Sequence, residues 1–220
     1  MKKGFIYILS FLFCLSSHAQ ILTTEPDFVT ESGSIKVVFD ASQGSKGLMN
    51  YNGDVYAHTG VITGSNDSRW EYASTWGVNS DKYKMASLGN NKWELTLSPD
   101  IRTYYGVPAG TPIKKLVFVF RSGAKSGNDY LTGKETGDKD IYLSVYESGL
   151  NVKLDSPAKD MVVEKGTSLT LTASSSVAAD LQLSVNETVV ATKNRATDIS
   201  ASYVFSSPGT YTVKATATLD

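Results

Sequence analysis

The feature that most constrains the fold of this chain is a series of short runs in which apolar and polar residues alternate. Each run is rich in β-branched or aromatic residues and is bounded by Gly, Asn or Asp. A period of two residues is typical of strands that bury one face. Beyond the first twenty residues no stretch shows the 3.6-residue apolar period of a helix, and only 84–106 has room for a short helical turn. We therefore predict an all-β fold of two consecutive β-sandwich domains.

Five strands are expected in the first two thirds of the sequence, at 34–39, 54–62, 92–97, 115–121 and 140–146. The third of these runs places Trp93, Leu95 and Leu97 on one face, so we expect Trp93 to lie in a core. The fourth run is almost continuously apolar, which indicates a strand that is buried on both faces.

The composition of the chain changes near residue 150. Of the 19 aromatic residues that follow residue 19, 14 lie between residues 51 and 146, including all three Trp. Only three follow residue 150, and the Asp-Ser-Pro sequence at 155–157 is a turn signal at the same place. We predict two modules, 20–153 and 154–220.

The second module has a more regular pattern. Its expected strands are 166–173, 180–185, 188–190, 201–205 and 210–215. Short strands with turn signals every ~8–12 residues are typical of an immunoglobulin-like sandwich. Tyr211 follows Pro208-Gly209, where such sandwiches often carry a Tyr that ties a corner, so we predict that it packs rather than binds a ligand.

Residues 1–19 have the layout of a secretory signal peptide. A short basic start precedes an apolar run over 4–15 that is too short to span a membrane as a helix, and a small-residue cleavage site ends at Ala19. The alternative is a lipoprotein signal that uses Cys14. Phe13 argues against it, because a small residue normally precedes the lipidated Cys. We expect export to the periplasm, the cell surface or the medium.

Removal of these 19 residues from 220 leaves a chain of 201 residues with no Cys and a single His, His58. That composition excludes a disulfide scaffold and every Cys-rich zinc site. The mature chain keeps 19 basic and 22 acidic residues, a net charge of −3. This gives no electrostatic reason to expect a nucleic-acid partner. We expect no transmembrane segment in the mature chain.

The sequence gives little support for catalysis. It contains no nucleophile elbow of the G-x-S-x-G type and no phosphate-binding glycine loop. A single His is too few for the usual His-based metal centre, and no pair among the acidic residues stands out as a glycosidase pair. We predict no catalytic residue, and we expect His58 at a strand end or on a binding surface.

A loop rich in Gly and Asp is the one place where a cation could bind. It contains Asp129, Asp138 and Asp140, and hard oxygen ligands in a turn suit Ca²⁺. The spacing does not match an EF-hand, and a solvated turn is the simpler interpretation. Ca²⁺ is the only cofactor that we consider.

Aromatic residues in a polar segment are the strongest functional signal. Trp70, Tyr72 and Trp76 lie among polar residues, where core packing explains them less easily than in an apolar strand. Sugar rings have apolar C–H faces that stack on aromatic rings, and their hydroxyls need polar neighbours. The candidate carbohydrate-binding residues are Tyr56, His58, Trp70, Tyr72, Trp76, Asn79 and Lys82. Trp70 and Trp76 could equally cover the sandwich core.

Several segments stand out together: 21–26 (Ile-Leu-Thr-Thr-Glu-Pro), 37–41 (Val-Val-Phe-Asp-Ala), 46–48 (Lys-Gly-Leu), 53–63 (Gly-Asp-Val-Tyr-Ala-His-Thr-Gly-Val-Ile-Thr), 70–76, 97–108, 118–122 and 138–141. In this combination they resemble the N-terminal region of bacterial secreted α-amylase-family glycoside hydrolases. The resemblance is specific only over 21–150. It implies a carbohydrate-binding-module-like β-sandwich similar to starch-binding modules, followed by an immunoglobulin-like module and then a catalytic (β/α)₈ barrel.

The resemblance implies a non-catalytic accessory region that binds or positions α-glucan, a starch-like polysaccharide, for the catalytic domain of a parent chain. The sequence stops at Asp220 without a barrel, so we expect that it is the front part of a longer protein and does not hydrolyse glucan by itself. Three alternatives stay open. The modules could be spacers, with Trp70 and Trp76 buried. They could be adhesin-type modules that bind proteins through an exposed apolar patch, or an enzyme in their own right.

Overall fold

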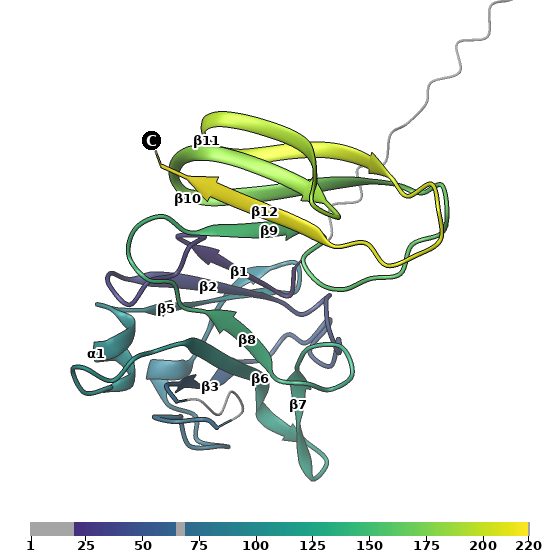
Figure 1. Ribbon diagram of the computed structural model, residues 1–220. Coiled ribbons are helices and arrows are strands. Elements are labelled where there is room, and N and C mark those ends of the chain that lie inside the picture. The colour runs from purple at the N-terminus through teal and green to yellow at the C-terminus, as the bar shows by residue number, and fades with distance from the viewer. Residues whose placement is uncertain (1–19, 65–68, 220) are drawn as a thin grey trace, which may run out of the picture.

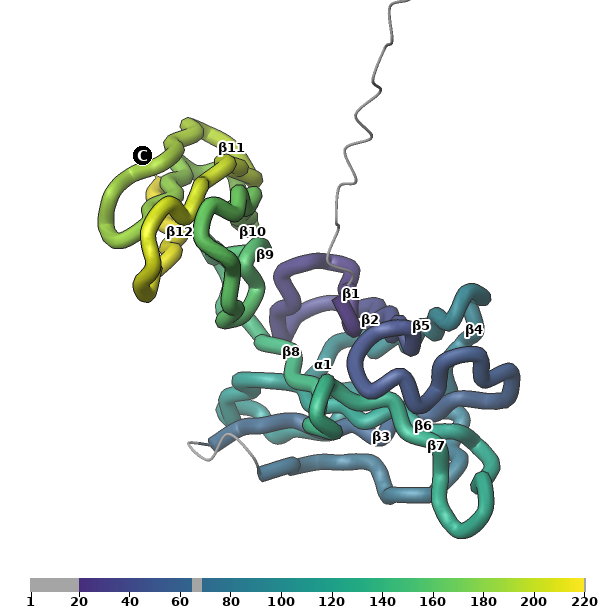
Figure 2. The backbone as a smooth tube through the Cα atoms, turned by 90° about the vertical axis from the view of Figure 1, so that its right-hand side faces the viewer, coloured from purple at the N-terminus to yellow at the C-terminus, as the bar shows by residue number. Residues whose placement is uncertain are grey.

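The computed structural model describes residues 20–64 and 69–219, and these residues form an all-β structure with three antiparallel sheets. The predicted signal peptide lies outside the described residues. Figure 1 shows two sheets of the N-terminal module below and the C-terminal sheet above. In the tube view of Figure 2 the C-terminal sheet stands apart from the rest. No helix among the described residues is long and apolar enough to cross a membrane.

The N-terminal module is built from two facing sheets. The first has the order β1–β2–β5–β4 and consists of β1 (Leu22–Glu25), β2 (Ile35–Asp40), β5 (Lys92–Leu97) and β4 (Ala86–Gly89). The second consists of β3 (Val55–Ile62), β6 (Lys115–Ser126) and β7 (Asp129–Gly133) in the order β3–β6–β7, with β8 (Ile141–Ser144) also paired to β6. All five strands expected in this module are present. Strands β1, β4 and β7 were not predicted.

The core of this module lies between the two sheets. Phe39 of β2 is fully buried and stacks on Phe120 of β6, with ring centroids 4.1 Å apart, and on Trp93 of β5 at 6.1 Å. Gly133 of β7 faces the same ring, because a Cβ there would lie 2.3 Å from the Phe39 Cζ atom. The prediction that Trp93 is a core residue is confirmed, and so is burial of both faces of β6 over 116–121.

Two short helices connect the sheets: the 3₁₀ helix η1 (Asp81–Tyr83) and α1 (Ile101–Tyr105). Asp100 caps α1 by accepting a hydrogen bond from the Thr103 backbone N–H at 2.8 Å, and Gly106 ends it with a left-handed φ of 73°. The helical turn expected within 84–106 is therefore confirmed.

The C-terminal module differs in detail from the prediction. It is a single sheet that consists of β9 (Val152–Ser156), β10 (Ser168–Val185), β11 (Thr188–Val204) and β12 (Val213–Thr218). The expected strands at 166–173 and 180–185 overlap β10, those at 188–190 and 201–205 overlap β11, and the one at 210–215 overlaps β12. The intervening residues contain no Gly or Pro, so they form an irregularity in the β10–β11 pairing instead of a turn.

A bend allows this one sheet to enclose its own core. The first part of β10 pairs with β9 and its last part, from Asp180, pairs with β12. Buried residues from both parts, among them Leu171, Leu181 and Leu183, belong to one hydrophobic cluster that is separate from the N-terminal core. Because β9 begins at Val152, the module boundary that we predicted after residue 153 falls inside this strand.

The segment that joins the modules is hydrogen-bonded to both of them. The backbone N–H of Tyr146 donates to the Val29 carbonyl at 2.7 Å. A few residues later, the backbone N–H of Asn151 donates to Ser176 Oγ at 2.8 Å, and the Ser176 N–H donates to the Asn151 carbonyl at 3.0 Å. The connection is therefore held at each end.

Candidate functional site

The candidate site lies on the outer face of the second sheet, which is the face turned away from the core. Side chains alternate along a strand, so Val55 and Ala57 of β3 point into the core while Tyr56 and His58 point outward. Tyr56 pairs with Arg121 of β6 in the register of the sheet. This face therefore carries aromatic and charged side chains whose positions are fixed by a rigid sheet.

Arg121 is the charged centre of this face. Its side chain is 2% exposed, and its guanidinium lies over the Tyr130 ring at 4.7 Å and the Tyr56 ring at 5.2 Å. It donates to Asn79 Oδ1 at 2.9 Å and to the Val78 carbonyl at 2.7 Å. Burial lowers the pKa of Arg121, and these contacts stabilise the charge in place of a carboxylate. Arg121 thereby holds the loop at 78–79 against the sheet.

The segment 69–76 runs antiparallel along the outer edge of β3. The backbones of Val61 and Glu71 exchange two hydrogen bonds of 2.9 Å, and the Ser74 N–H donates to the Thr59 carbonyl at 2.9 Å. Gly60 makes this approach possible, because a Cβ there would lie 2.9 Å from the Glu71 carbonyl oxygen. These backbone contacts place the segment next to the outer face, and the Thr63 hydroxyl adds a hydrogen bond to the Glu71 carboxylate.

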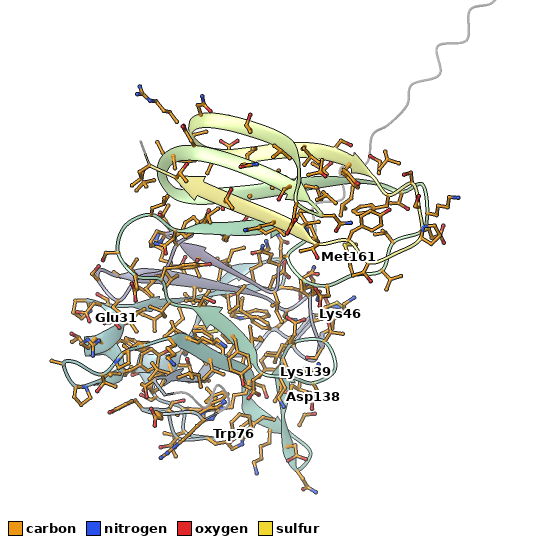
Figure 3. All side chains as sticks on the ribbon, viewed as in Figure 1. Glu31, Lys46, Trp76, Asp138, Lys139 and Met161 are labelled. Atoms are coloured by element: carbon orange, nitrogen blue, oxygen red, sulfur yellow. The ribbon has the colours of Figure 1, made fainter. Side chains whose placement is uncertain are left out.

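His58, Trp70, Trp76 and Tyr130 form what we call the aromatic cluster. The His58 ring stacks on Trp70, with centroids 4.9 Å apart and planes inclined by 23°. Trp76 meets His58 edge-on at 5.0 Å and Tyr130 edge-on at 6.0 Å. The side chain of Trp76 is 48% exposed, whereas Trp70 is half-buried and donates from Nε1 to Asp140 Oδ2 at 3.1 Å. In Figure 3 Trp76 lies at the end of the N-terminal module that is farthest from the C-terminal sheet.

His58 is oriented by a neighbouring hydroxyl. Ser74 Oγ accepts the Thr59 backbone N–H at 3.1 Å and lies 3.0 Å from Nδ1 of His58. We assign the Ser74 proton to this second bond, which leaves the ring proton of neutral His58 on Nε2. Burial and, to a smaller extent, the positive charge of Arg121 lower the pKa of His58, while Asp140 has a weaker opposite effect. The ring therefore offers a neutral hydrogen-bond donor at neutral pH.

The structure brings together five of the seven predicted sugar-binding residues: Tyr56, His58, Trp70, Trp76 and Asn79. Tyr72 is 41% exposed with a left-handed φ of 50°, and the structure records no ring contact between it and the cluster. Lys82 lies elsewhere. It donates to the Tyr104 carbonyl and stands 4.6 Å over the Tyr104 ring. Its ammonium therefore serves to attach η1 to α1.

Sequence reasoning missed Arg121 and Tyr130. Arg121 was counted within an apolar strand, although a single charge in such a run is a sign of a side chain with a specific partner. Tyr130 lies in β7, which begins in a segment that we expected to be a loop. Its hydroxyl donates to the Gly77 carbonyl at 3.3 Å, so it supports the same loop as Arg121.

The three predicted calcium ligands have separate contacts. Asp140 accepts from Trp70, Asp138 forms an ion pair with Lys134 at 3.6 Å, and Asp129 begins β7. Within residues 20–64 and 69–219, no group of three or more His, Cys, Asp or Glu residues is placed to hold a metal ion. Figure 3 marks Asp138 on the loop between β7 and β8. Calcium binding by this loop stays a prediction.

The chemistry that this face offers is that of stacking and hydrogen bonding. Half-exposed rings can contact apolar C–H groups, and His58 Nε2 and the indole nitrogen of Trp76 can donate to hydroxyl groups. Ser74 lies within hydrogen-bond distance of His58, as a nucleophile would. However, the Ser74 hydroxyl also accepts the Thr59 backbone N–H, and the Asp140 carboxylate accepts from the Trp70 indole. Both groups therefore have hydrogen-bond partners other than His58.

No known protein family matches the chain, and a comparison with curated proteins also gives no match.

Proposed function

We propose that the chain is a non-catalytic accessory region of a secreted α-amylase-type glycoside hydrolase, and that it binds or positions α-glucan through the aromatic cluster. The observation that carries this proposal is the half-exposed indole of Trp76, held edge-on to His58 beside the Trp70–His58 stack. Two indoles whose planes differ in direction contact a curved chain of sugar rings better than a flat surface. The resemblance of 21–150 to the N-terminal region of these enzymes supports the same proposal.

Trp76 is held in position by the contacts of its loop, although its own side chain is half exposed. Its loop is fixed by Arg121 through the Val78 carbonyl and by Tyr130 through the Gly77 carbonyl. Side chains that are already held in place lose little entropy when a ligand binds, which favours binding to a flexible polysaccharide. Trp76 is therefore held in position in the free protein.

Affinity electrophoresis in gels that contain soluble starch at high loading tests the proposal. We expect the wild-type chain to be retarded and Trp76→Ala to bind about three- to tenfold more weakly, because one stacking contact is worth about 0.5–1.5 kcal/mol. Leu88→Ala is the matched control, since Leu88 is 52% exposed on β4 of the other sheet. Unretarded wild type, or equal retardation of Trp76→Ala and wild type, would sink the proposal.

The two alternatives, a spacer without a ligand site and an adhesin-type module that binds proteins, make different predictions. A spacer requires no retardation of any variant and buried Trp70 and Trp76, which the 48% exposure of Trp76 does not support. An adhesin-type module would be retained by envelope proteins and not by starch. Ca²⁺ binding, export and the presence of a catalytic domain in the parent chain belong to the same proposal. The reading frame after the codon for Asp220 tests the last of these directly.

A further inference from the structure

A polar pocket is formed by residues that do not belong to the aromatic cluster. It is an open pocket with a volume of about 440 Å³, lined by the loop at 50–53 and by the turn at 89–91 between β4 and β5. Four of its ten lining residues are Asn, at positions 50, 52, 90 and 91, and none is acidic. The volume is within the range of about 300–1,000 Å³ that is usual for small-ligand sites.

Backbone geometry explains only some of these Asn residues. Asn50, Asn90 and Asn91 have left-handed φ values of 62°, 49° and 62°, a conformation that Asn tolerates better than most residues. Asn91 also joins the two sides of the pocket, because its Oδ1 accepts the Asn50 backbone N–H at 2.5 Å. Asn52 has no such backbone requirement, since its φ is not positive.

The pocket offers neutral donors and acceptors that are not used inside the protein. Among the residues that the structure describes, the side-chain amides of Asn52 and Asn90 have no hydrogen-bond partner. Each amide has both donor and acceptor atoms, as a pair of sugar hydroxyls does. The one charged lining residue, Lys92, is paired with Asp40 at 3.6 Å. The pocket is therefore suited to a neutral ligand rather than to an anion.

Tyr51 supplies an aromatic wall. Its half-buried ring packs on the core, and its hydroxyl lies against Gly53, where a Cβ would be only 2.3 Å from it. The absence of a side chain at position 53 is therefore what allows the phenol to occupy this place. An aromatic ring beside several amides is the combination that the apolar faces and the hydroxyls of a sugar need.

We propose that this amide pocket binds a saccharide, as a second contact for the glucan that the aromatic cluster binds, so that this inference rests on the proposed function. The two sites are linked through adjacent backbone. The carbonyl of Asp54, next to the pocket, accepts the Gly123 N–H at 2.7 Å, and the Gly123 carbonyl accepts Asn79 Nδ2 at 3.0 Å. Asn79 belongs to the loop that carries Trp76. The backbone next to the pocket is therefore joined, through Gly123, to the loop that carries Trp76.

Titration of the ¹⁵N-labelled chain with maltoheptaose tests the proposal by NMR. We expect the side-chain amide signals of Asn52 and Asn90 to shift together with the indole N–H signals of Trp70 and Trp76. The double variant Asn52→Ala/Asn90→Gly removes both amides, and Gly keeps the left-handed backbone at position 90. We expect about tenfold weaker binding of maltoheptaose, because two neutral hydrogen bonds are lost. Glu187→Gly, at a left-handed turn with φ 66° between β10 and β11, is the matched control with unchanged affinity.

The outcomes separate the two proposals. Indole shifts that saturate without any shift of the Asn amides overturn the pocket and leave the proposed function intact. Amide shifts without indole shifts support the pocket and contradict the aromatic site, and no shift at either place contradicts both. If the double variant does not give a folded spectrum, Asn52→Ala alone replaces it, since Asn52 is exposed and its backbone places no demand on the side chain.

Discussion

The two modules use their aromatic residues in different ways. In the N-terminal module the core is filled from two sheets, so the outer face of β3–β6–β7 is available for His58, Trp70 and Trp76. In the C-terminal module, Tyr203, Phe205 and Tyr211 pack on one another at one end of the sheet, with centroids between 4.9 and 6.2 Å apart. A two-layer module can thus carry aromatic residues for another purpose, whereas the single bent sheet needs them for its own packing.

The largest effect should come from the core that distinguishes the N-terminal module. Phe39→Ala removes a fully buried ring between Phe120 and Trp93 and should cost about 4 kcal/mol of unfolding free energy. Hydrogen exchange measured by mass spectrometry should show lost protection in β2 and β6 and unchanged protection in β10. Leu183→Ala, in the C-terminal core, should give the reverse pattern. Equal loss in both modules would mean that they unfold as one unit.

A smaller loss of unfolding free energy is expected from a substitution on the outer face of β3–β6–β7. Arg121→Leu removes the guanidinium that binds the Val78 carbonyl and Asn79 Oδ1, so the loop at 78–79 loses two charged hydrogen bonds to the sheet. We expect about 3 kcal/mol lower stability and a red-shifted, more mobile Trp76 fluorescence. Lys125→Leu is the control, because Lys125 also stands over the Tyr130 ring, at 5.7 Å, but is exposed. Similar results for both variants would refute a special role of the buried Arg.

Loss of a hydroxyl among Tyr203, Phe205 and Tyr211 of the C-terminal module should lower the free energy of unfolding by less. Tyr211 donates to the Ser207 carbonyl at 2.9 Å, which confirms the predicted corner role of this Tyr. Tyr211→Phe keeps the ring packing and should cost only about 0.5–1 kcal/mol in urea denaturation. Tyr203→Phe, whose hydroxyl has no recorded partner among the described residues, should be neutral. A loss well above 1 kcal/mol for Tyr211→Phe would contradict the interpretation that this hydroxyl contributes a single hydrogen bond.

The smallest change in the free energy of unfolding is expected from the protonation of His58. Its pKa in the folded chain is lowered, so the unfolded chain binds more protons between the usual value near 6.5 and the lower folded value. Stability should therefore fall as the pH drops through this window and level off below it. The difference between wild type and His58→Gln in chemical denaturation between pH 7.5 and 4.5 measures it. A wild-type stability that rises relative to the variant on acidification would contradict the sign.

Much of the fold follows from residue patterns, and the exceptions have physical reasons. The strands β2, β3, β5, β6 and β8 were predicted because each combines alternation or an apolar run with clear turn residues. In the C-terminal module the Ser- and Ala-rich stretch at 174–179 looks like a break in the sequence. It is an irregularity within β10, because continued pairing with β11 outweighs weak local preference.

The candidate site was partly predictable for a similar reason. Polar surroundings identified Trp70 and Trp76, and Tyr56 and His58 were predicted because their residue types suit contacts with a sugar. Arg121 and Tyr130 depend on which residues face each other across β3, β6 and β7, and pairing register between distant strands is not written in local sequence. Lys82 was predicted as a polar partner for sugar hydroxyls, but its ammonium lies over the Tyr104 ring.

The segment 69–76, which runs along the edge of β3, has a consequence for aggregation. An open strand edge with free N–H and C=O groups is a template for pairing with other molecules and for aggregation. Because Glu71 and Ser74 occupy the backbone groups of Val61 and Thr59, part of this edge is already closed within the chain. Gly60, which permits the close approach, thereby helps to protect this part of the edge from pairing with another chain.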